Sequence, residues 1–281
     1  MVVYTEAQQR RLSRVIPDLI QSRDLLIYLV WRDLRARYRN AMMGFFWAVL
    51  QPVLMAAILT LVFTVAFPDR VGATRTGPPY AVLLLCGLIP WQFLSGSLIS
   101  ATHSLVDNQN LVKKVYFPRE IIPIATVSNS LINLFIGFVL IEVVHLGFGG
   151  MPGWGLLGLP LIFAILFVLV IGVSLLCASL NVHFRDVVYF LEVALALGFY
   201  ATPIIYPLDW VLPRLLEHPW LYRVYMLNPM AGLVPAYQQA LLSNHFPAPH
   251  LWIWPAVCAS AALLLGAWVF RRNAPLMADY L

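Results

Sequence analysis

The chain has 281 residues, of which 61% are hydrophobic and 11% are charged, and its formal net charge is +5. Soluble domains carry about 25% charged residues, so a water-soluble globule of this composition would lack polar surface. The apolar residues form continuous runs, whereas an outer-membrane barrel needs alternation. The composition therefore excludes both classes and predicts an all-α integral membrane protein.

The first predicted element is a helix over residues 22–39, within a polar and basic N-terminal segment, residues 1–43. The helical repeat gathers apolar side chains on one face and arginines on the other. The apolar set is Leu26, Ile27, Val30, Trp31, Leu34 and Tyr38, and the arginines are Arg32, Arg35 and Arg39. This pattern predicts a helix along the cytoplasmic membrane surface, and a solvated helix packed on other protein is the alternative.

Six apolar windows then approach or exceed the ~20 residues that a helix needs to cross a bilayer. They cover residues 44–67, 80–102, 121–146, 156–180, 187–206 and 251–270. Residues 44–281 are therefore predicted to form one six-span transmembrane domain. Six spans place both termini on one side, which receives 14 Lys and Arg residues against 4 on the other. Because cytoplasmic loops retain positive charge, both termini are predicted to be cytoplasmic.

Polar residues are rare in the predicted spans. Asn129 and Asn133 lie four residues apart on one face of the third span, beside Ser128 and Ser130. Such residues either bond to neighbouring helices or take part in transport, and the sequence leaves both roles open. No Asp, Glu, Lys, Arg or His lies at the centre of a span, so transport driven by protons or sodium is not expected.

Two segments between the spans are unusual. Residues 207–250, on the predicted external side, contain seven prolines yet keep apolar stretches, so short re-entrant helices are predicted there. The aromatic residues of this segment suit either an interfacial belt or contact with a substrate. On the predicted cytoplasmic side, residues 107–119 carry Lys113, Lys114 and Arg119. A short helix there can dock into a separate motor protein or bind anionic lipid headgroups, and both remain open.

The chain shows no catalytic centre of its own. It has no G-x-x-x-x-G-K-[ST] phosphate loop and no Gly-Lys pair, so ATP binding of that kind is not expected. The six His and three Cys residues show no metal-ligand spacing, so no metal site and no catalytic residue is predicted. A membrane enzyme acting on a lipid-linked sugar would need an interfacial cluster of acidic or His residues, and these residues are isolated. The chain is therefore predicted to be a transport subunit.

Five stretches together resemble one known family, the membrane subunits of ABC-2-type polysaccharide exporters, which move O-antigen, capsule or teichoic acid polymers. They are "RDLRARYRNAMMGFFWAVLQPVL" at 32–54, "GLIPWQFLSGSL" at 87–98, "LVDNQNLVKKVYFPREIIPIA" at 105–125, "NVHFRDVVYFLEVALALGFYATPIIYPLDWVL" at 181–212 and "LNPMAGLVPAYQQALL" at 227–242. The resemblance covers nearly the whole chain after residue 25 and keeps the family's order.

The resemblance implies a half-transporter in the inner membrane. Two copies would form a twelve-span homodimeric pore, above two copies of a separate ABC ATPase that binds ATP and Mg. The cargo would be a lipid-linked polysaccharide, O-antigen foremost, with capsule or teichoic acid polymers as alternatives and a small molecule or drug as a more distant one. No nucleic-acid partner is expected, and membrane lipids surround the chain.

The resemblance also implies roles for particular residues. Residues 107–118 would be the helix that couples to the ATPase, and the residues assigned to this coupling are Asp107, Asn108, Asn110, Leu111, Lys113, Lys114, Val115, Tyr116, Phe117, Pro118 and Arg119. The helix at 22–39 would be a gate element at the membrane surface, through Trp31, Arg32, Arg35, Tyr38 and Arg39. Residues 207–250 would form the external gate, through Pro207, Trp210, Asn228 and Pro229.

A sugar path needs aromatic rings for stacking and polar groups for the hydroxyls. Phe45, Phe46, Trp47 and Gln51 on the first span, with Tyr200 and Tyr206 on the fifth, would supply both if those faces turn inward. The alternative for each of these residues is that it faces lipid.

Overall fold

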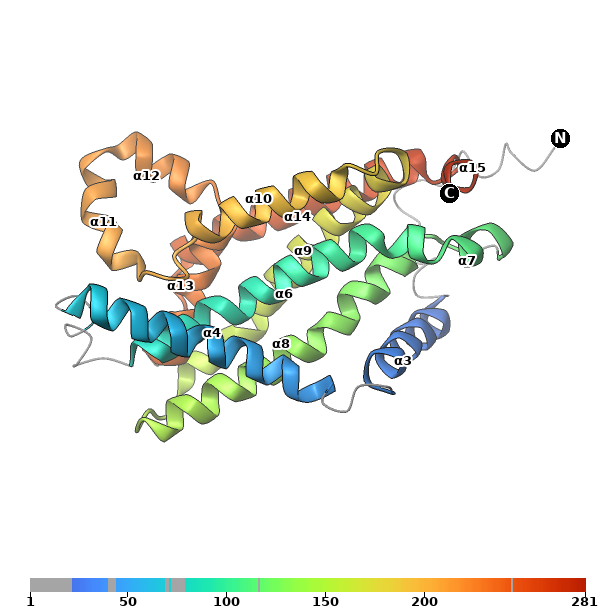
Figure 1. The fold of residues 1–281 in the computed structure, drawn as a ribbon. Helices are drawn as coiled ribbons and strands as arrows, with labels where there is room; N and C mark the ends of the chain where they lie inside the picture. Colours follow the sequence, from blue (N-terminus) through green and yellow to red (C-terminus); the bar gives the residue numbers. More distant parts are fainter. Residues whose placement is uncertain (1–21, 40–43, 69–70, 72–78, 116, 244) are drawn as a thin grey trace.

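The computed structural model describes residues 22–39, 44–68, 71, 79–115, 117–243 and 245–281, and within them it contains helices and no strand (Figure 1). The helices are α3 (Arg23–Arg39), α4 (Gly44–Ala66), α6 (Tyr80–Asp107), α7 (Gln109–Lys114), α8 (Ile121–Gly147), η3 (Trp154–Gly158), α9 (Leu159–His183), α10 (Val187–Ala201), α11 (Leu208–Glu217), α12 (Pro219–Met226), α13 (Pro229–Leu242), α14 (Pro249–Asn273) and α15 (Met277–Tyr280). The predicted all-α class is confirmed.

Five of the described helical segments are long and apolar enough to cross a membrane: α4, α6, α8, η3 with α9, and α14. The fifth predicted span, residues 187–206, is a helix of only 15 residues, α10. It ends because Thr202 precedes Pro203, and a residue before proline is disfavoured in the helical region; Thr202 is extended, with φ −107° and ψ 143°. The count of six spans therefore stays a prediction.

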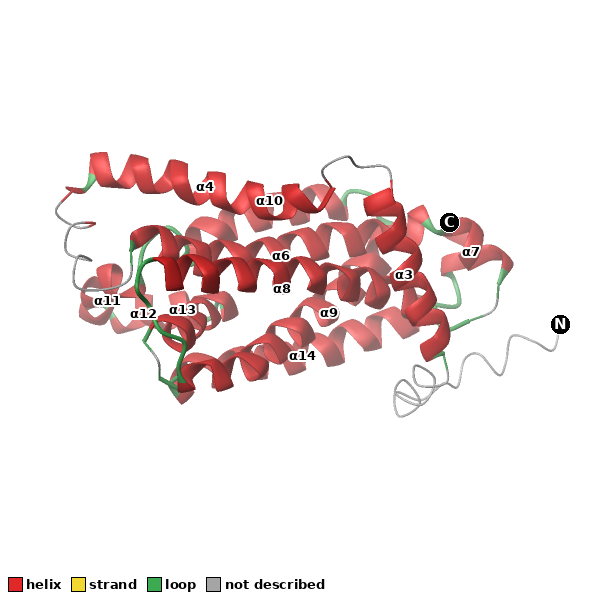
Figure 2. Ribbon diagram, turned by 90° about the horizontal axis from the view of Figure 1, so that it is seen from below, coloured by secondary structure: helices red, strands yellow, loops and turns green. Residues whose placement is uncertain are grey.

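The long helices form one bundle with two distinct ends (Figures 1 and 2). α3, α7 and α15 gather at one end, here called the α7 end, and α11 and α12 lie at the other. α10 runs lengthwise from the α7 end toward α11 (Figure 1) and packs against α6 and α9. The first and last described helices therefore lie at the same end of the bundle, as an even number of passes requires.

α6 is the central helix of the bundle and packs against α4, α8, α9, α10 and α13. Most of its apolar side chains are buried, including Leu84, Leu88 and Leu98. α13, from the proline-rich segment, is also buried and packs against α6, α9 and α14. The prolines thus divide residues 207–250 into two exposed helices, α11 and α12, and one helix that belongs to the core.

The most extensive helix contact joins α9 and α14. Gly172 of α9 and Gly266 of α14 meet there, and a methyl group added at Gly266 would overlap the carbonyl oxygen of Gly172. Small residues at such a crossing let two membrane helices approach at backbone distance. This crossing holds the last long helix onto the bundle.

Candidate functional site

The predicted coupling segment forms a short hairpin at the α7 end. α6 runs to Asp107, and its last turn is closed by Asn108, whose side chain donates to the Ser104 carbonyl oxygen at 2.8 Å. α7 then covers Gln109–Lys114 and Val115 is extended. The predicted range of residues 107–118 therefore contains α7 together with both of its turns.

α7 has one buried side and one exposed side. Val112 is 3% exposed, and Leu111 and Phe117 are partly buried against the same apolar cluster. The exposed residues of the segment are Asp107, Gln109, Asn110, Lys113, Lys114 and Val115. These six residues form the exposed surface, here called the α7 surface, whereas Phe117 anchors the hairpin. Tyr116 lies outside the described residues.

The cluster beneath α7 is separate from the main core and draws on six other helices. Its buried members are Val112 of α7 itself, Leu29 of α3, Leu105 of α6, three residues of α8 (Ile121, Ile122 and Ala125), three of α9 (Leu175, Ala178 and Val182), two of α14 (Ala267 and Phe270), and Met277 of α15. Close-packed interiors contain few voids and transmit strain. Val112 therefore joins α7 by packing to a cluster that six other helices share.

α3 is tied to this corner by a polar contact that the sequence pattern did not reveal. The Arg32 guanidinium donates to the Asn108 side-chain oxygen at 2.9 Å and pairs with Asp33 at 2.8 Å. Arg32 therefore points inward, whereas the helical pattern predicted an outward direction. The contact joins the predicted gate helix directly to the turn between α6 and α7.

α3 has one stripe that packs on the protein and another, within the predicted apolar face, that stays exposed. Leu29, which was not in the predicted apolar face, is 2% exposed, while Ile27 and Trp31 are 51% and 55% exposed. The helix rests on α8, so tertiary packing selects the stripe around Leu29. The exposed stripe keeps Trp31, with the Arg35 guanidinium 5.9 Å from its ring, and this stripe suits a membrane surface. The side chains of Tyr38 and Arg39 are not described.

Two further contacts fix the segment between α7 and α8. Arg119 donates to the Ala274 carbonyl oxygen after α14. Glu120 pairs with Arg271 of α14 at 3.3 Å, with side-chain exposures of 12% and 13%. The hairpin is therefore clamped to the end of the last long helix.

We expect Glu120→Ala to destabilise the chain by about 3–5 kcal/mol, because removal of one partner leaves a nearly buried charge uncompensated. Thermal unfolding of the purified protein measures the loss. The double variant Glu120→Ala with Arg271→Ala should lose less than the sum of the two single alanine variants. Additive losses would contradict a direct Glu120–Arg271 interaction.

An aromatic groove of about 760 Å³ lies between α4, α6 and α10. It brings together Trp47 and Gln51 of α4 with Tyr200 of α10, three of the predicted channel residues. Phe46 is half exposed and does not line the groove, and the side chain of Phe45 is not described. Tyr206 does not line it either: its hydroxyl donates to the Tyr200 carbonyl oxygen at 3.0 Å.

Sequence reasoning missed two rings in this aromatic groove, Trp91 of α6 and Phe199 of α10, which meet edge to face at 6.0 Å. Both stand beside predicted features, Trp91 after Pro90 and Phe199 before Tyr200. A helical-face comparison of the second and fifth spans would have found them. With Gln51 and Gln92 at its wall, the groove offers both stacking surfaces and amide groups.

The predicted external gate is built around the start of α11. Trp210 stacks on Tyr80 of α6 with ring centroids 6.1 Å apart and an interplanar angle of 1°, and the Tyr80 hydroxyl donates to the Ile205 carbonyl oxygen. Pro207 precedes α11 as its N-cap residue. Trp210 therefore joins the segment to the core and is not a free lipid anchor.

Asn228 connects α10 with α13. Its side-chain oxygen accepts from the Met230 backbone N–H at 3.0 Å, and its amide nitrogen donates to the Thr202 hydroxyl at 2.9 Å. Pro229 follows at the first helical position, where the missing N–H is not needed. This single side chain caps one helix and holds the end of another.

Asn228→Ala should lower stability by about 1–2 kcal/mol, the usual cost of losing a helix cap. Asn228→Asp keeps an oxygen for the Met230 N–H and removes the donor to Thr202, so it should lose less. Thermal melting of the two variants and the parent protein tests this order. Equal losses would show that the cap contributes nothing.

The described part of the chain contains no group of three His, Cys, Asp or Glu residues that would hold a metal ion.

Residues 24–242 match the family described as ABC-2 type transporter, and the chain belongs to this family. It is 31% identical over 234 residues to the O-antigen export system permease protein RfbA of Myxococcus xanthus, which covers 83% of this chain and 86% of the relative. The protein of the same name from Klebsiella pneumoniae is 30% identical over 222 residues, 79% of this chain and 81% of the relative.

A more distant relative is the polysialic acid transport protein KpsM of Escherichia coli, 23% identical over 251 residues, 87% of this chain and 92% of the relative. The resemblance predicted from five stretches of sequence is thereby confirmed at the level of the family. The chain is a multi-pass membrane protein of a bacterial export permease family.

Proposed function

We propose that the chain is the permease subunit of an ATP-driven exporter that carries lipid-linked O-antigen polysaccharide across the inner membrane. Two copies form the pore, two copies of a separate ATPase dock on the α7 surface, and both termini are cytoplasmic. The ATPase binds ATP and Mg, and this chain supplies the path. The names of the curated relatives support the cargo.

The proposal that the ATPase docks on α7 rests on how α7 is attached to the rest of the chain. Lys113, Lys114 and Val115 are exposed on a hairpin whose other side is buried in a cluster shared by seven helices. A lipid anchor would need only the charges. A site that receives movement also needs a rigid connection to the spans, and α7 has one through Val112, Arg32 and the Glu120–Arg271 pair.

The exposed faces of α4 and α10 support a second copy. On α4, Leu54, Ile58 and Leu61 are 48–67% exposed, and on α10 Phe190 and Leu197 are 76% and 68% exposed. These faces flank the aromatic groove, which is open on one side. A second chain placed over them would close two half-grooves into one channel lined by rings and amides, which suits a neutral polymer.

ATP hydrolysis on the partner would act through a population shift. A partner changes the balance of closed and open pore states only by contacting them differently. The α7 hairpin is the place proposed for such a contact, because Val112 packs in a cluster that also contains residues of α6 and α8.

Deletion of the gene in its own host tests the function. The deletion should remove the polysaccharide from the cell surface and leave lipid-linked glycan in the cytoplasmic leaflet, and a plasmid copy should restore export. Surface polysaccharide at the parental level in the deletion strain would contradict the proposal. The glycan that accumulates distinguishes O-antigen from a capsule or wall polymer.

A further inference from the structure

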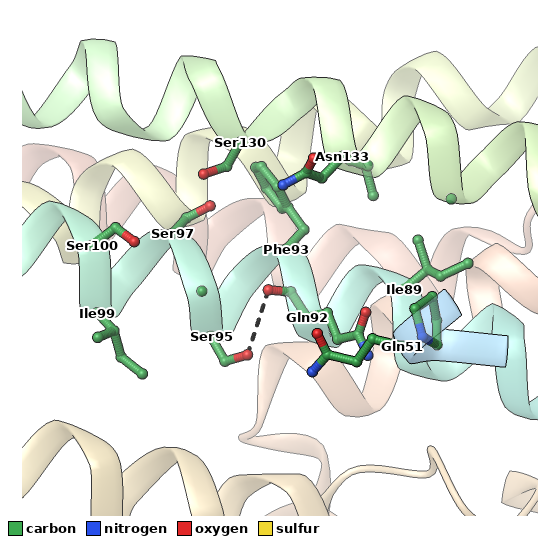
Figure 3. A pocket seen from close by; sticks show the side chains of 14 residues that line it. Gln51, Ile89, Gln92, Phe93, Ser95, Ser97, Ile99, Ser100, Ser130 and Asn133 are labelled. Carbon is green, nitrogen blue, oxygen red and sulfur yellow. Dashed lines mark hydrogen bonds between the residues drawn. The ribbon is translucent and has the colours of Figure 1, made fainter. Parts of the chain in front are cut away.

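A second cavity, of about 320 Å³, lies between α4, α6 and α8 (Figure 3). Its polar lining residues are two glutamines, Gln51 and Gln92, four serines, Ser95, Ser97, Ser100 and Ser130, and one asparagine, Asn133. Figure 3 shows the Ser97 hydroxyl turned from α6 toward Ser130 of α8. The cavity lies on the α8 side of α6, opposite the aromatic groove, and Gln51 and Gln92 line both.

The cavity continues toward the α7 end. A neighbouring cavity of about 470 Å³ shares Ile99 and Ser100 with it and is further lined by Asn129, Asp107 and Asp33. The two together are called the polar groove. It leads from the surface near α7 to the middle of α6, where it meets the aromatic groove.

Two buried polar atoms in the polar groove lack a partner among the described residues. Ser97 is 0% exposed and Asn129 is 4% exposed, yet the Ser97 hydroxyl and the Asn129 side-chain oxygen make no hydrogen bond there. Other helical hydroxyls nearby donate to their own helix, as Thr102 does to the Leu98 carbonyl oxygen at 2.7 Å. Because an unpaired buried polar atom is costly, such atoms mark a place for a hydrogen-bonding ligand or water.

The charges along the polar groove define the ligand. Among the described residues, no Lys or Arg side chain lines either of its two cavities, whereas Asp33, His103 and Asp107 stand at the α7 end. The Arg32 guanidinium beside them is already paired with Asp33 and Asn108, so a phosphate or pyrophosphate group would have to compete with a carboxylate for it. Neutral hydroxyl groups can pair with the serines and amides, and the Phe93 ring adds a surface for C–H stacking.

We propose that the polar groove binds a neutral sugar unit of the transported glycan, reached from the α7 end, before the glycan enters the aromatic groove at Gln51 and Gln92. The volumes of its two cavities, about 320 and 470 Å³, each fall in the range of about 300–1,000 Å³ that is usual for small-molecule sites. The inference rests on the proposed function, since it names a position for the same cargo.

Gly96 offers a way to fill the polar groove without moving a helix. It lines the cavity, and a methyl group built on it would meet no atom within 4 Å. Gly96→Phe should reduce exported polysaccharide about tenfold. This expectation assumes that the added ring fills the polar groove in all but about a tenth of the chains. Gly147→Phe is the matched control, because Gly147 also has open space around it and lies at the far end of α8.

Cysteine labelling measures occupancy directly. The free cysteines Cys86, Cys177 and Cys258 are replaced by alanine, and one new cysteine is placed at Gly96 or at Tyr200 in the aromatic groove. Inverted membrane vesicles are treated with a small cationic methanethiosulfonate reagent. Vesicles from cells that accumulate the glycan, through an inactive partner ATPase, should label Gly96→Cys about tenfold more slowly than glycan-free vesicles.

Slower labelling at Gly96→Cys, together with lost export in Gly96→Phe, supports the inference. An equal labelling rate of Gly96→Cys with and without the glycan, together with protection of Tyr200→Cys by the glycan, would overturn the inference and leave the proposed function intact. Protection of Gly96→Cys in glycan-free vesicles by inorganic pyrophosphate but not by maltose would overturn the neutral-sugar assignment.

If the Gly96→Phe protein fails to accumulate in the cell, the labelling experiment alone tests the inference. If the parent chain does not restore export to the deletion strain, the proposed function fails as well.

Discussion

Reversing both charges on the exposed side of α7, with Lys113→Glu and Lys114→Glu, is expected to abolish glycan-dependent ATP hydrolysis while the chain stays folded. Both lysines are exposed, and neither belongs to the apolar cluster around Val112 that attaches α7 to the bundle. Two like-charge contacts at a docking surface cost about 3 kcal/mol or more, which weakens ATPase binding at least about a hundredfold. Co-purified ATPase and hydrolysis in reconstituted vesicles measure the effect.

The matched control is the double charge reversal Arg214→Glu and Arg223→Glu. Both arginines are exposed on α11 and α12 at the opposite end of the bundle. This control should retain the ATPase. Normal hydrolysis and export in the Lys113/Lys114 variant would show that α7 is not the docking surface, and binding of that variant to anionic vesicles would then test the lipid-anchor alternative.

The second large effect is expected at the α9–α14 crossing. Gly266→Leu should prevent the chain from folding or destabilise it by more than about 3 kcal/mol, the upper end of ordinary overpacking costs. The added side chain would meet the Gly172 carbonyl oxygen, and backbone cannot move aside as a flexible side chain can. The amount of folded protein recovered in mild detergent and its melting temperature report the loss.

Gly147→Leu serves as the comparison, since an added carbon there meets nothing within 4 Å. It should fold and melt like the parent. A Gly266→Leu protein with parental yield and melting temperature would contradict the close approach of α9 and α14.

Helix positions could be predicted closely from the sequence, because apolar run length and flanking charge decide them. The predicted windows 44–67, 80–102 and 121–146 begin at the same residues as α4, α6 and α8. The helix predicted over 22–39 is α3, Arg23–Arg39. The window 187–206 was too long because hydropathy alone does not show that the helix ends before Pro203, which disfavours a helical conformation at Thr202.

The direction of individual side chains was harder to predict, since it depends on which neighbour covers a helix face. The 3.6-residue repeat placed Arg32 in solvent, but Asn108, 76 residues away, turns it inward. The same limit hid Trp91 and Ser97, which belong to cavities formed by three helices distant in sequence. Asn129 and Asn133 could be recognised as unusual, and only the fold showed that both line the polar groove.

Purification of the tagged chain from its own host in mild detergent, followed by mass spectrometry of what accompanies it, tests the central claim most directly. A half-transporter predicts a separate ABC ATPase in equal amount, two copies of each chain in the complex, and co-purified glycolipid. Recovery of the chain without any ATPase under several gentle conditions, from cells that display the polysaccharide, would contradict an exporter driven through α7.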